Sequence, residues 1–562
     1  MGVRRRTRGP VAPSVTVGPN PRSGHRPPDA DSTVSRSVVS SWAAAATDDQ
    51  QPAKRTGPMP LRRILPPLAV IVLVALLARA QTVPDARYWR LDDVNQQLAA
   101  WAAAHPELVH VTTLGTSGQG EAIPLVCISD HAAVREREPG VFQHAAQHAN
   151  ECNGTGAVMD AIARLLAGYG DDPAVTARVD GLELWFAPIV NVDGHRHVFS
   201  GAPSWADWRK TMRDNDADGE VDFPGDGVDL NRNWDWRWDE YDESDPASQK
   251  YRGPFPFSEA EARALRDFVL RERPLVVVDY HSPVTISWTD EIFYVWPSSP
   301  DHLIARDVAL EWADATRNRH GDAYGAIYAF DTLPKEQCWV HGNTGILVFL
   351  VEIEDRCWFT GATVDSVAHR VARGSMTLLD RVLAGPGVRG RVTDAVTGAP
   401  LAAEVALAEL DGGGIGPRRC DQATGSFERL TGTGNYTLRV SMRDYEDAEI
   451  PVTVTAGWST IDVALDPIAT AVDDPGPRRP WLDLPNPLRA GQRLTLRLPA
   501  GASVARADLY DVRGRHVTTL ATGLAAASDH RLAVPRDLAD GVYLLRIRSG
   551  ASTVARRLVY LH

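Results

Sequence analysis

Short apolar runs alternate with longer segments of helical periodicity between residues 88 and 383. Runs rich in Val, Ile, Leu and aromatic residues predict buried strands at residues 109–115, 123–129, 140–146, 182–190, 274–281 and 345–354. Apolar positions spaced three and four apart predict amphipathic helices at residues 90–108, 156–169, 258–272 and 302–320. The alternation predicts an α/β domain with a mixed sheet over residues 84–383, whose ligand sites lie on loops at strand ends.

The pattern changes after Leu383. Short runs with alternating apolar positions, separated by turns that contain Gly, Thr and Asp, predict strands and no further long helix. We expect two small all-β sandwich domains, at residues 387–467 and 488–562, joined by a Pro- and Asp-rich linker at residues 468–487. The predicted fold class is therefore α/β followed by two all-β units.

A different hydrophobic pattern occurs near the N-terminus. Two arginines precede the apolar run Ile64–Ala78, and the ending Ala78-Arg79-Ala80 before Gln81 has the small-residue pattern of a cleavage site. This order predicts a signal peptide at residues 59–80, whereas a permanent membrane anchor would need a longer apolar run. Residues 1–58 have no periodicity, so we expect them to be a disordered leader or to precede the true start at Met59.

Charge and cysteine content narrow the class of protein. The net charge is −13 even with the basic N-terminal region included, so nucleic acid and anionic membranes are poor partners. The five cysteines include no CxxC pair, which argues against a zinc site built from thiolates. An exported chain can oxidise one pair, and Cys338 with Cys357 is the pair to test.

Two predicted strands lead directly into groups that bind metals. His148 and Glu151 follow the strand at residues 140–146, and His281 ends the strand at residues 274–281. Two imidazoles and one carboxylate can fill three positions around Zn²⁺ and leave the fourth for water, which is the pattern of a catalytic site. Taken singly, each histidine could equally be a satisfied polar group at a strand end.

Other polar residues stand at ends of apolar segments or in loops. Glu352 ends a strongly apolar strand, where a carboxylate needs a partner or a role as general base; an N-cap or a salt bridge would also explain it. Arg209, Asn231 and Arg232 lie in loops from which a guanidinium could bind a carboxylate or an oxyanion. A lone loop arginine is usually solvated, so only the combination is informative.

The ordered motifs of residues 148–354 resemble those of the zinc carboxypeptidases. They are His148-x-x-Glu151, the turn at residues 188–194, WRKT, GVDLNRNW, His281-Ser282 and FLVEIED. The resemblance implies that zinc is bound by His148, Glu151 and His281. It implies that Glu352 activates the zinc-bound water, that Arg209 polarises the scissile carbonyl, and that Asn231 and Arg232 hold the terminal carboxylate of the substrate.

The resemblance reaches further positions less directly. Tyr328 is the best match for the family's mobile tyrosine, although the segment up to Trp339 is about two residues longer than the family pattern. Gln337 falls near the position that selects the substrate side chain, and a neutral amide beside Glu336 favours neither basic nor apolar ends. Residues 387–467 resemble a transthyretin-like module and residues 488–562 resemble Ig-like sorting modules of exported bacterial enzymes.

We therefore expect a zinc-dependent carboxypeptidase that acts on peptides or proteins with a free C-terminus. It would be monomeric, with no membrane span after signal removal, and located outside a bacterium, on its surface or in the periplasm. A murein-directed zinc peptidase or amidase of the same fold is the alternative enzyme. A non-catalytic surface binding protein is the alternative of another class.

An acidic loop after the WRKT string suggests a second metal. Asp214, Asp216, Asp218 and Asp222, with Gly219, match the start of a Ca²⁺ loop. The twelfth place is glycine rather than the usual bidentate Glu, so the match is incomplete. A solvated acidic turn is an equally good interpretation.

Overall fold

The computed structural model describes residues 84–468, apart from 202–203, 284–288 and 412–413, and the segments 481–483, 488–489, 493–497, 505–511, 513–524, 529–535, 538–549 and 552–561. The predicted leader, the signal peptide and most of the predicted linker lie outside these residues. Within them, no helix combines the length and the apolar character needed to cross a membrane.

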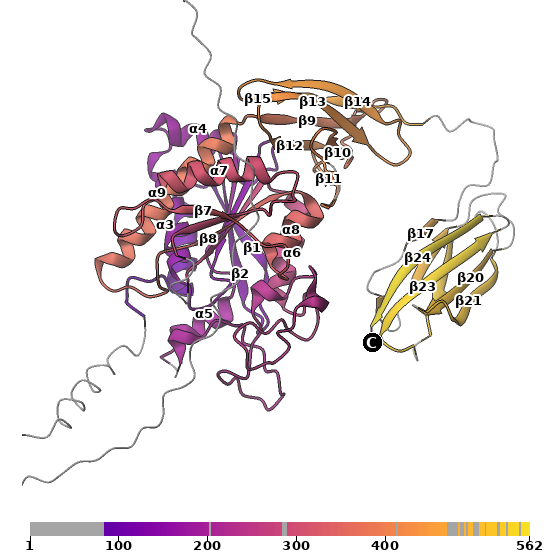
Figure 1. The fold of residues 1–562 in the computed structure, drawn as a ribbon, viewed down its shortest axis with the longest axis horizontal. Coiled ribbons are helices and arrows are strands. Elements are labelled where there is room, and N and C mark those ends of the chain that lie inside the picture. Colours follow the sequence, from indigo (N-terminus) through magenta and orange to yellow (C-terminus); the bar gives the residue numbers. More distant parts are fainter. Residues whose placement is uncertain are drawn as a thin grey trace, which may run out of the picture. The chain divides into compact units, whose positions relative to one another are not determined.

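A mixed eight-stranded sheet forms the centre of the first domain (Figure 1), in the order β1-β2-β4-β3-β5-β8-β6-β7. Its strands are β1 Val109–Thr116, β2 Ala122–Ile128, β3 Gly140–Ala145, β4 Glu183–Ala187, β5 Val276–His281, β6 Glu291–Tyr294, β7 Gly325–Tyr328 and β8 Leu347–Glu352. Strands β4, β3, β5 and β8 pair in parallel, whereas β1 with β2, β2 with β4 and β6 with β8 are antiparallel. The predicted mixed α/β class is confirmed.

Helices cover both faces of this sheet, with α3 and α9 on one side and α6 and α8 on the other (Figure 1). The helices are α2 Leu91–Ala104, α3 Asn153–Gly168, α4 Pro173–Gly181, α5 Val192–Val198, α6 Ala260–Glu272, α7 His302–Ala315, α8 Glu336–Thr344 and α9 Ala362–Ala384, with short 3₁₀ turns η1 Trp205–Asp207, η2 Leu230–Arg232 and η3 Trp238–Glu240. Helix α3 approaches the sheet closely because Gly154 has no side chain: a Cβ there would lie 2.7 Å from Cβ of Tyr280.

The helices differ from the sequence expectation in two ways: α7 is shorter than predicted, and α4, α5, α8 and α9 were not predicted. Helix α7 ends at Ala315 rather than near residue 320, because residues 317 and 323 pair in an isolated bridge. Helix α9 was not predicted, although its buried Val364, Val367, Val371 and Leu378 follow helical spacing. Its polar residues are numerous enough to mask an apolar stripe that packs on α3 and α7.

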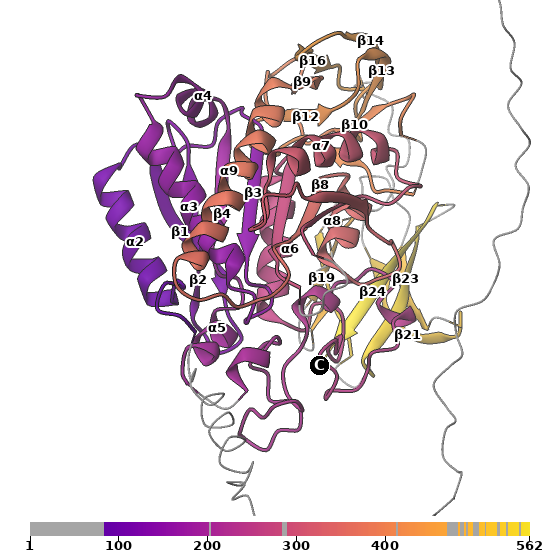
Figure 2. The same ribbon diagram turned by 60° about the vertical axis from the view of Figure 1, so that its left-hand side comes forward.

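Residues 387–465 form two facing groups of strands (Figure 2), which we call the β module. Its strands are β9 Gly387–Asp394, β10 Glu404–Leu407, β11 Arg418–Arg419, β12 Ser426–Leu430, β13 Gly434–Ser441, β14 Ala448–Val454, β15 Trp458–Thr460 and β16 Val463–Leu465. A separate apolar core fills it, which agrees with the predicted all-β character. Its identity as a transthyretin-like module stays a prediction.

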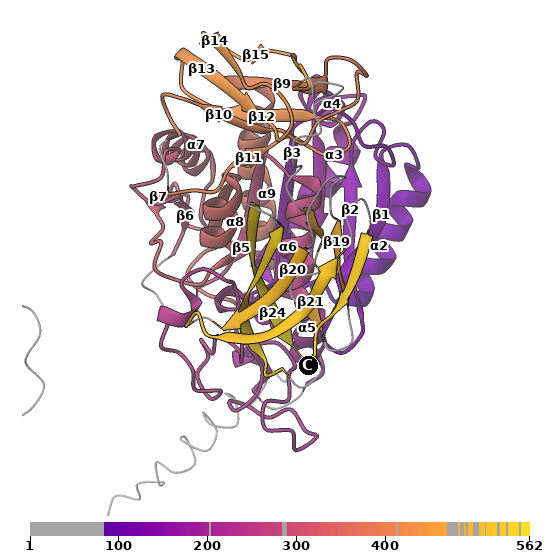
Figure 3. The same cartoon turned by 90° about the vertical axis from the view of Figure 1, so that its right-hand side faces the viewer.

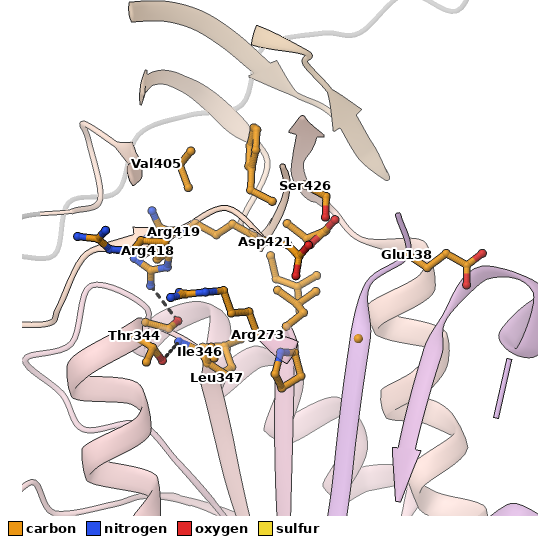
Figure 4. Close-up of a pocket in the computed structure, with 18 of the residues that line it drawn as sticks. Glu138, Arg273, Thr344, Ile346, Leu347, Val405, Arg418, Arg419, Asp421 and Ser426 are labelled. Carbon is orange, nitrogen blue, oxygen red and sulfur yellow. Dashed lines mark hydrogen bonds between the residues drawn. The ribbon is translucent and has the colours of Figure 1, made fainter. Parts of the chain in front are cut away.

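The β module contacts the α/β domain through buried charges. Arg418 and Arg429 both donate to Asp301, which is 2% exposed, and both also pair with Asp411 of the module. Figure 4 shows the cavity at this contact, with Arg273 and Arg418 among the residues that line it. Because Arg418, Arg419 and Arg429 are each paired with a carboxylate, we assign this cavity to the packing of the module.

The last described strands form a three-stranded sheet and a five-stranded sheet, part of which is visible in Figure 3. They are β17 Trp481–Asp483, β18 Leu488–Arg489, β19 Arg493–Arg497, β20 Ala505–Asp511, β21 His516–Leu524, β22 Asp529–Ala533, β23 Gly541–Ser549 and β24 Ser552–Leu561. They share a third apolar core. All-β structure is therefore present here as predicted, and the Ig-like assignment stays a prediction.

The five cysteines are buried and free, so the structure contains no bond between Cys338 and Cys357. The Cys338 thiol points at the carbonyl of Phe330, whereas the Cys357 thiol points at the carbonyl of Ser282.

Candidate active site

The central parallel strands bring the predicted metal ligands together at one edge of the sheet. Strand β3 leads into His148 and Glu151 just before α3, and β5 ends at His281. The Nδ1 atoms of the two histidines lie 2.9 Å apart. His148 Nδ1 is 2.8 Å from Oε1 of Glu151, and His281 Nδ1 is 2.8 Å from Oε2 of the same carboxylate. All three side chains are buried. The structure thus joins residues that are 130 positions apart in the chain.

The opposite nitrogens of the two imidazoles are held by carboxylates. His148 Nε2 lies 3.0 Å from Asp229 Oδ1, and His281 Nε2 lies 2.7 Å from Asp279 Oδ2. Such partners fix the tautomer and the ring orientation of metal-binding histidines. Neither aspartate was among the predicted site residues. The available signal was a charged residue at position 279 inside an otherwise apolar strand, on the same face as residue 281.

The donor set fits zinc. Three ligand atoms from His148, Glu151 and His281 lie within 4.8 Å of one another. Burial alone would raise the pKa of Glu151, but the two imidazoles outweigh it and hold that pKa well below its usual range. The carboxylate therefore stays ionised, and two histidines plus one carboxylate form the ligand set of catalytic zinc sites.

A second buried group lies behind the cluster. His144 Nε2 is 3.1 Å from Glu336 Oε1, and Gln147 Nε2 donates to Asp279 Oδ2 at 2.9 Å and also to Glu336. These contacts connect α8 to the carboxylate that orients His281. We therefore regard Asp279 and Glu336 as supporting residues rather than as groups facing a substrate.

Glu352 stands at the end of β8, directly opposite His281 in the strand register. Its Oε2 atom is buried and has no hydrogen-bond partner among the described residues. Burial, together with the nearby charge of Glu151, raises the pKa of Glu352 to about 7. An unpaired carboxylate with a pKa near neutrality is suited to accept and return a proton.

Arg209 lies on the other side of the cluster. Its Nη1 donates to Glu151 Oε1 at 3.0 Å, while its Nε and Nη2 donate to Asp229 Oδ2 at 3.2 and 3.1 Å. The carbonyl of Arg209 accepts a hydrogen bond from Ala149, which fixes the loop beside the metal ligands. These hydrogen bonds hold the guanidinium beside the cluster, where it can stabilise negative charge that develops there during a reaction.

Comparison with known proteins agrees with this geometry. Residues 94–360 match the family model described as zinc carboxypeptidase. Residues 94–360 therefore form a domain of that family. Carboxypeptidase A2 of Rattus norvegicus is 28% identical over 243 residues, covering 42% of this chain and 54% of that protein. Carboxypeptidase B of Astacus astacus is 28% identical over 278 residues, covering 48% and 86%.

A solved structure, carboxypeptidase A of Helicoverpa armigera, is 21% identical, with a TM-score of 0.45 and coverage of 56% of this chain and 80% of that chain. This chain spans 54% and 61% of the lengths of carboxypeptidase A2 of Rattus norvegicus and carboxypeptidase A6 of Homo sapiens. The match to these relatives is thus a match of the zinc carboxypeptidase domain.

The zinc carboxypeptidase domain carries Asn231 and Arg232 on the turn η2, which Asp229 caps through the amide of Asn231 at 2.9 Å. Arg232 Nε donates to the hydroxyl of Tyr241 at 3.1 Å, and its Nη1 donates to the carbonyl of Asn231 at 2.7 Å. Among the described residues no carboxylate lies within the 4.0 Å of an ion pair with Arg232. The guanidinium therefore retains capacity for an anion.

The other two predicted substrate-binding residues, Tyr328 and Gln337, make their contacts away from the cluster. Tyr328 is 40% exposed, and its ring contacts His302 and Phe330. Gln337 is buried, and its amide nitrogen donates to the carbonyls of two neighbouring strands at 2.9 Å. Their proposed roles stay predictions, because no contact joins either residue to the zinc ligands in the described part of the chain.

The acidic loop is folded around its own backbone amides. Asp214 accepts from the amides of Ala217 and Gly219, at 2.6 and 2.9 Å. Carboxylates of Asp214, Asp216 and Asp218 come close enough to share an ion, whereas Asp222 does not join this group. Asp226, which is buried, accepts from the amides of residues 215 and 222 instead.

Proposed function

We propose that this chain is a secreted, monomeric zinc carboxypeptidase that removes the C-terminal residue from peptides or proteins outside a bacterium. The observation that carries the activity is the unpaired Glu352 carboxylate beside the His148, Glu151 and His281 cluster. The proposed export is supported by the signal-like pattern at residues 59–80. The alternative site of action is the periplasm.

Each residue of the proposed site has a separate role in the proposed reaction. Zinc, when bound by the three ligands, supplies a Lewis acid for the scissile carbonyl and for water. The Glu352 carboxylate takes a proton from the attacking water and delivers it to the nitrogen of the leaving residue. The Arg209 guanidinium donates hydrogen bonds to the oxyanion of the tetrahedral intermediate. Asn231 and Arg232 hold the terminal carboxylate, so that the last peptide bond is the one presented.

The test is release of amino acids from peptides with free or amidated C-termini, with and without a zinc chelator. We expect single residues to be released from free ends only and the release to stop after chelation. Cleavage of amidated and free peptides at equal rates would contradict a carboxypeptidase. Binding of peptides without any release would favour a non-catalytic binding protein.

We predict that Arg232→Ala raises KM for free-ended peptides by roughly 10- to 100-fold, because a charged hydrogen bond to the carboxylate is worth about 1.5–3 kcal/mol. The advantage of free over amidated peptides should narrow accordingly. Steady-state kinetics on both peptides measure the effect. The matched control is Arg237→Ala, since the Arg237 side chain is 43% exposed and lies 3.9 Å from Glu240. An unchanged preference in Arg232→Ala would refute the carboxylate clamp.

A murein-directed peptidase or amidase of the same fold is the second candidate, because peptidoglycan stem peptides also carry free carboxylates. Its supporting observation is that the Arg232 guanidinium, which has no carboxylate partner among the described residues, could donate to such a carboxylate. Purified stem peptides in the same assay distinguish the two: release from stem peptides with no release from ordinary peptides favours this candidate.

We also propose that the acidic loop binds Ca²⁺ through Asp214, Asp216 and Asp218, without the predicted ligand Asp222. Binding to the folded state alone, at 100 times Kd, would stabilise the protein by about 2.7 kcal/mol. We predict that millimolar calcium raises Tm of the zinc-loaded protein by a few degrees and that Asp216→Ala with Asp218→Ala abolishes the rise. Scanning calorimetry measures it. A Tm indifferent to calcium would leave the loop as an ordinary acidic surface.

A further inference from the structure

The segment before α8 packs against the turn that carries the carboxylate clamp. The amide of Glu336 donates to Oδ1 of Asn231 at 3.1 Å, and the amide of Trp234 donates to the carbonyl of Pro334 at 3.4 Å. Lys335 lies between these two contacts, as the residue that precedes the first turn of α8. Two hydrogen bonds therefore fix the backbone of Lys335 beside the loop of Arg232.

The two residues that follow Lys335 are already engaged. Glu336 is fully buried and is bound by His144 and Gln147. Gln337 uses its amide nitrogen on the carbonyls of Phe293 and Val348. The first turn of α8 therefore offers a substrate neither the acidic group nor the amide donor that its sequence suggests.

Lys335 differs from both. Its side chain is half-buried, and among the described residues it has no hydrogen bond and no ion pair within 4.0 Å. Burial and the nearby charge of Arg232 lower the pKa of Lys335 to about 8, while the carboxylates of Glu352 and Asp229 raise it. Asp229 is already bonded by Arg209 and His148, so it has little capacity left for a third cation.

Two neighbouring cations without carboxylate partners, Lys335 and Arg232, thus lie at the proposed substrate site. Like charges repel, so the arrangement favours ligands that bring negative charge to both. A C-terminal residue with an apolar or amide side chain brings one carboxylate, whereas C-terminal Asp or Glu brings two. An acidic terminal residue satisfies both cations at once.

We propose that Lys335 is a specificity-determining residue that binds the side-chain carboxylate of a C-terminal Asp or Glu, while Arg232 and Asn231 bind the main-chain carboxylate. The proposal rests on the carboxypeptidase function proposed above. It assigns to this chain a preference for acidic ends, which the neutral Gln337 by itself does not indicate.

The test compares four peptides that differ only in their last residue: Glu, Gln, Leu or Lys. Glu and Gln have nearly the same size, so their ratio of kcat/KM reports charge. We expect wild-type protein to favour Glu over Gln by at least about tenfold, the effect of one charged hydrogen bond. Lys335→Met should remove most of this ratio and leave the rate on Gln within about threefold.

Further variants separate charge from structure. Lys335→Arg should keep a preference for Glu, and Lys335→Glu should move the preference toward the peptide ending in Lys. Lys250→Met is the matched control, because Lys250 is exposed. Zinc content and Tm of each variant establish that it is folded.

The outcomes are distinct. An equal loss on all four peptides in Lys335→Met would mean that Lys335 shares the main-chain carboxylate, and it would overturn the proposal while leaving the carboxypeptidase function intact. A wild-type preference for Leu or Lys over Glu would overturn it without any variant. Failure of zinc-loaded wild-type protein to release any of the four residues would overturn the proposed function, and this proposal with it.

Discussion

Glu352→Gln is expected to lower kcat by about 10²–10⁴-fold, the usual contribution of a general base. The amide has nearly the same shape as the carboxylate but cannot accept the proton of the attacking water. The wild-type carboxylate is suited to that step because its Oε2 has no competing hydrogen-bond partner among the described residues. Zinc content should stay the same, since Glu352 is not among the ligands of the cluster.

The measurement is kcat at saturating peptide, with zinc determined on the same sample. Glu354→Gln is the matched control, because Glu354 is a nearby buried carboxylate that pairs with Arg370 at 3.0 Å instead of facing the cluster. It should keep kcat within a few-fold. A Glu352→Gln variant that turned over within a few-fold of wild type would show that another group takes the proton.

His148→Ala and His281→Ala are each expected to lose zinc, and activity with it. The proposed site has three protein ligands, so either substitution leaves two. Changes in residues that only orient the ligands already cost about 10–100-fold in metal affinity, and removal of a ligand should cost more. Elemental analysis after dialysis against metal-free buffer should give close to one zinc per wild-type chain and almost none for either variant.

His341→Ala provides the control for this experiment. His341 is equally buried, but it bonds to the hydroxyl of Ser299 and the carbonyl of Ile346, away from the cluster. Its replacement should reduce stability and leave zinc binding in place. Full zinc occupancy in both His148→Ala and His281→Ala would remove these residues from the metal site.

The sequence by itself determined the fold class, and it predicted the donor groups of the proposed site. Apolar runs ending in His148, His281 and Glu352 predicted strand ends, and parallel strands place such ends at one edge of a sheet. In the observed sheet, the parallel pairing of β5 with β8 places His281 directly opposite Glu352. The change to period-two patterning after residue 383 likewise predicted all-β structure, because the burial of one strand face depends on local alternation.

Only the tertiary structure decided which partners these groups have. The contact of His144 with Glu336 joins residues 192 positions apart in the sequence, and a local sequence pattern cannot predict a contact over that separation. Packing between distant elements also places the carboxylate of Asp229 beside His148 and engages the amide nitrogen of Gln337 on strand carbonyls. Hydrogen bonding between distant elements therefore engages Glu336 and Gln337 and, among the described residues, leaves the Lys335 ammonium without a partner.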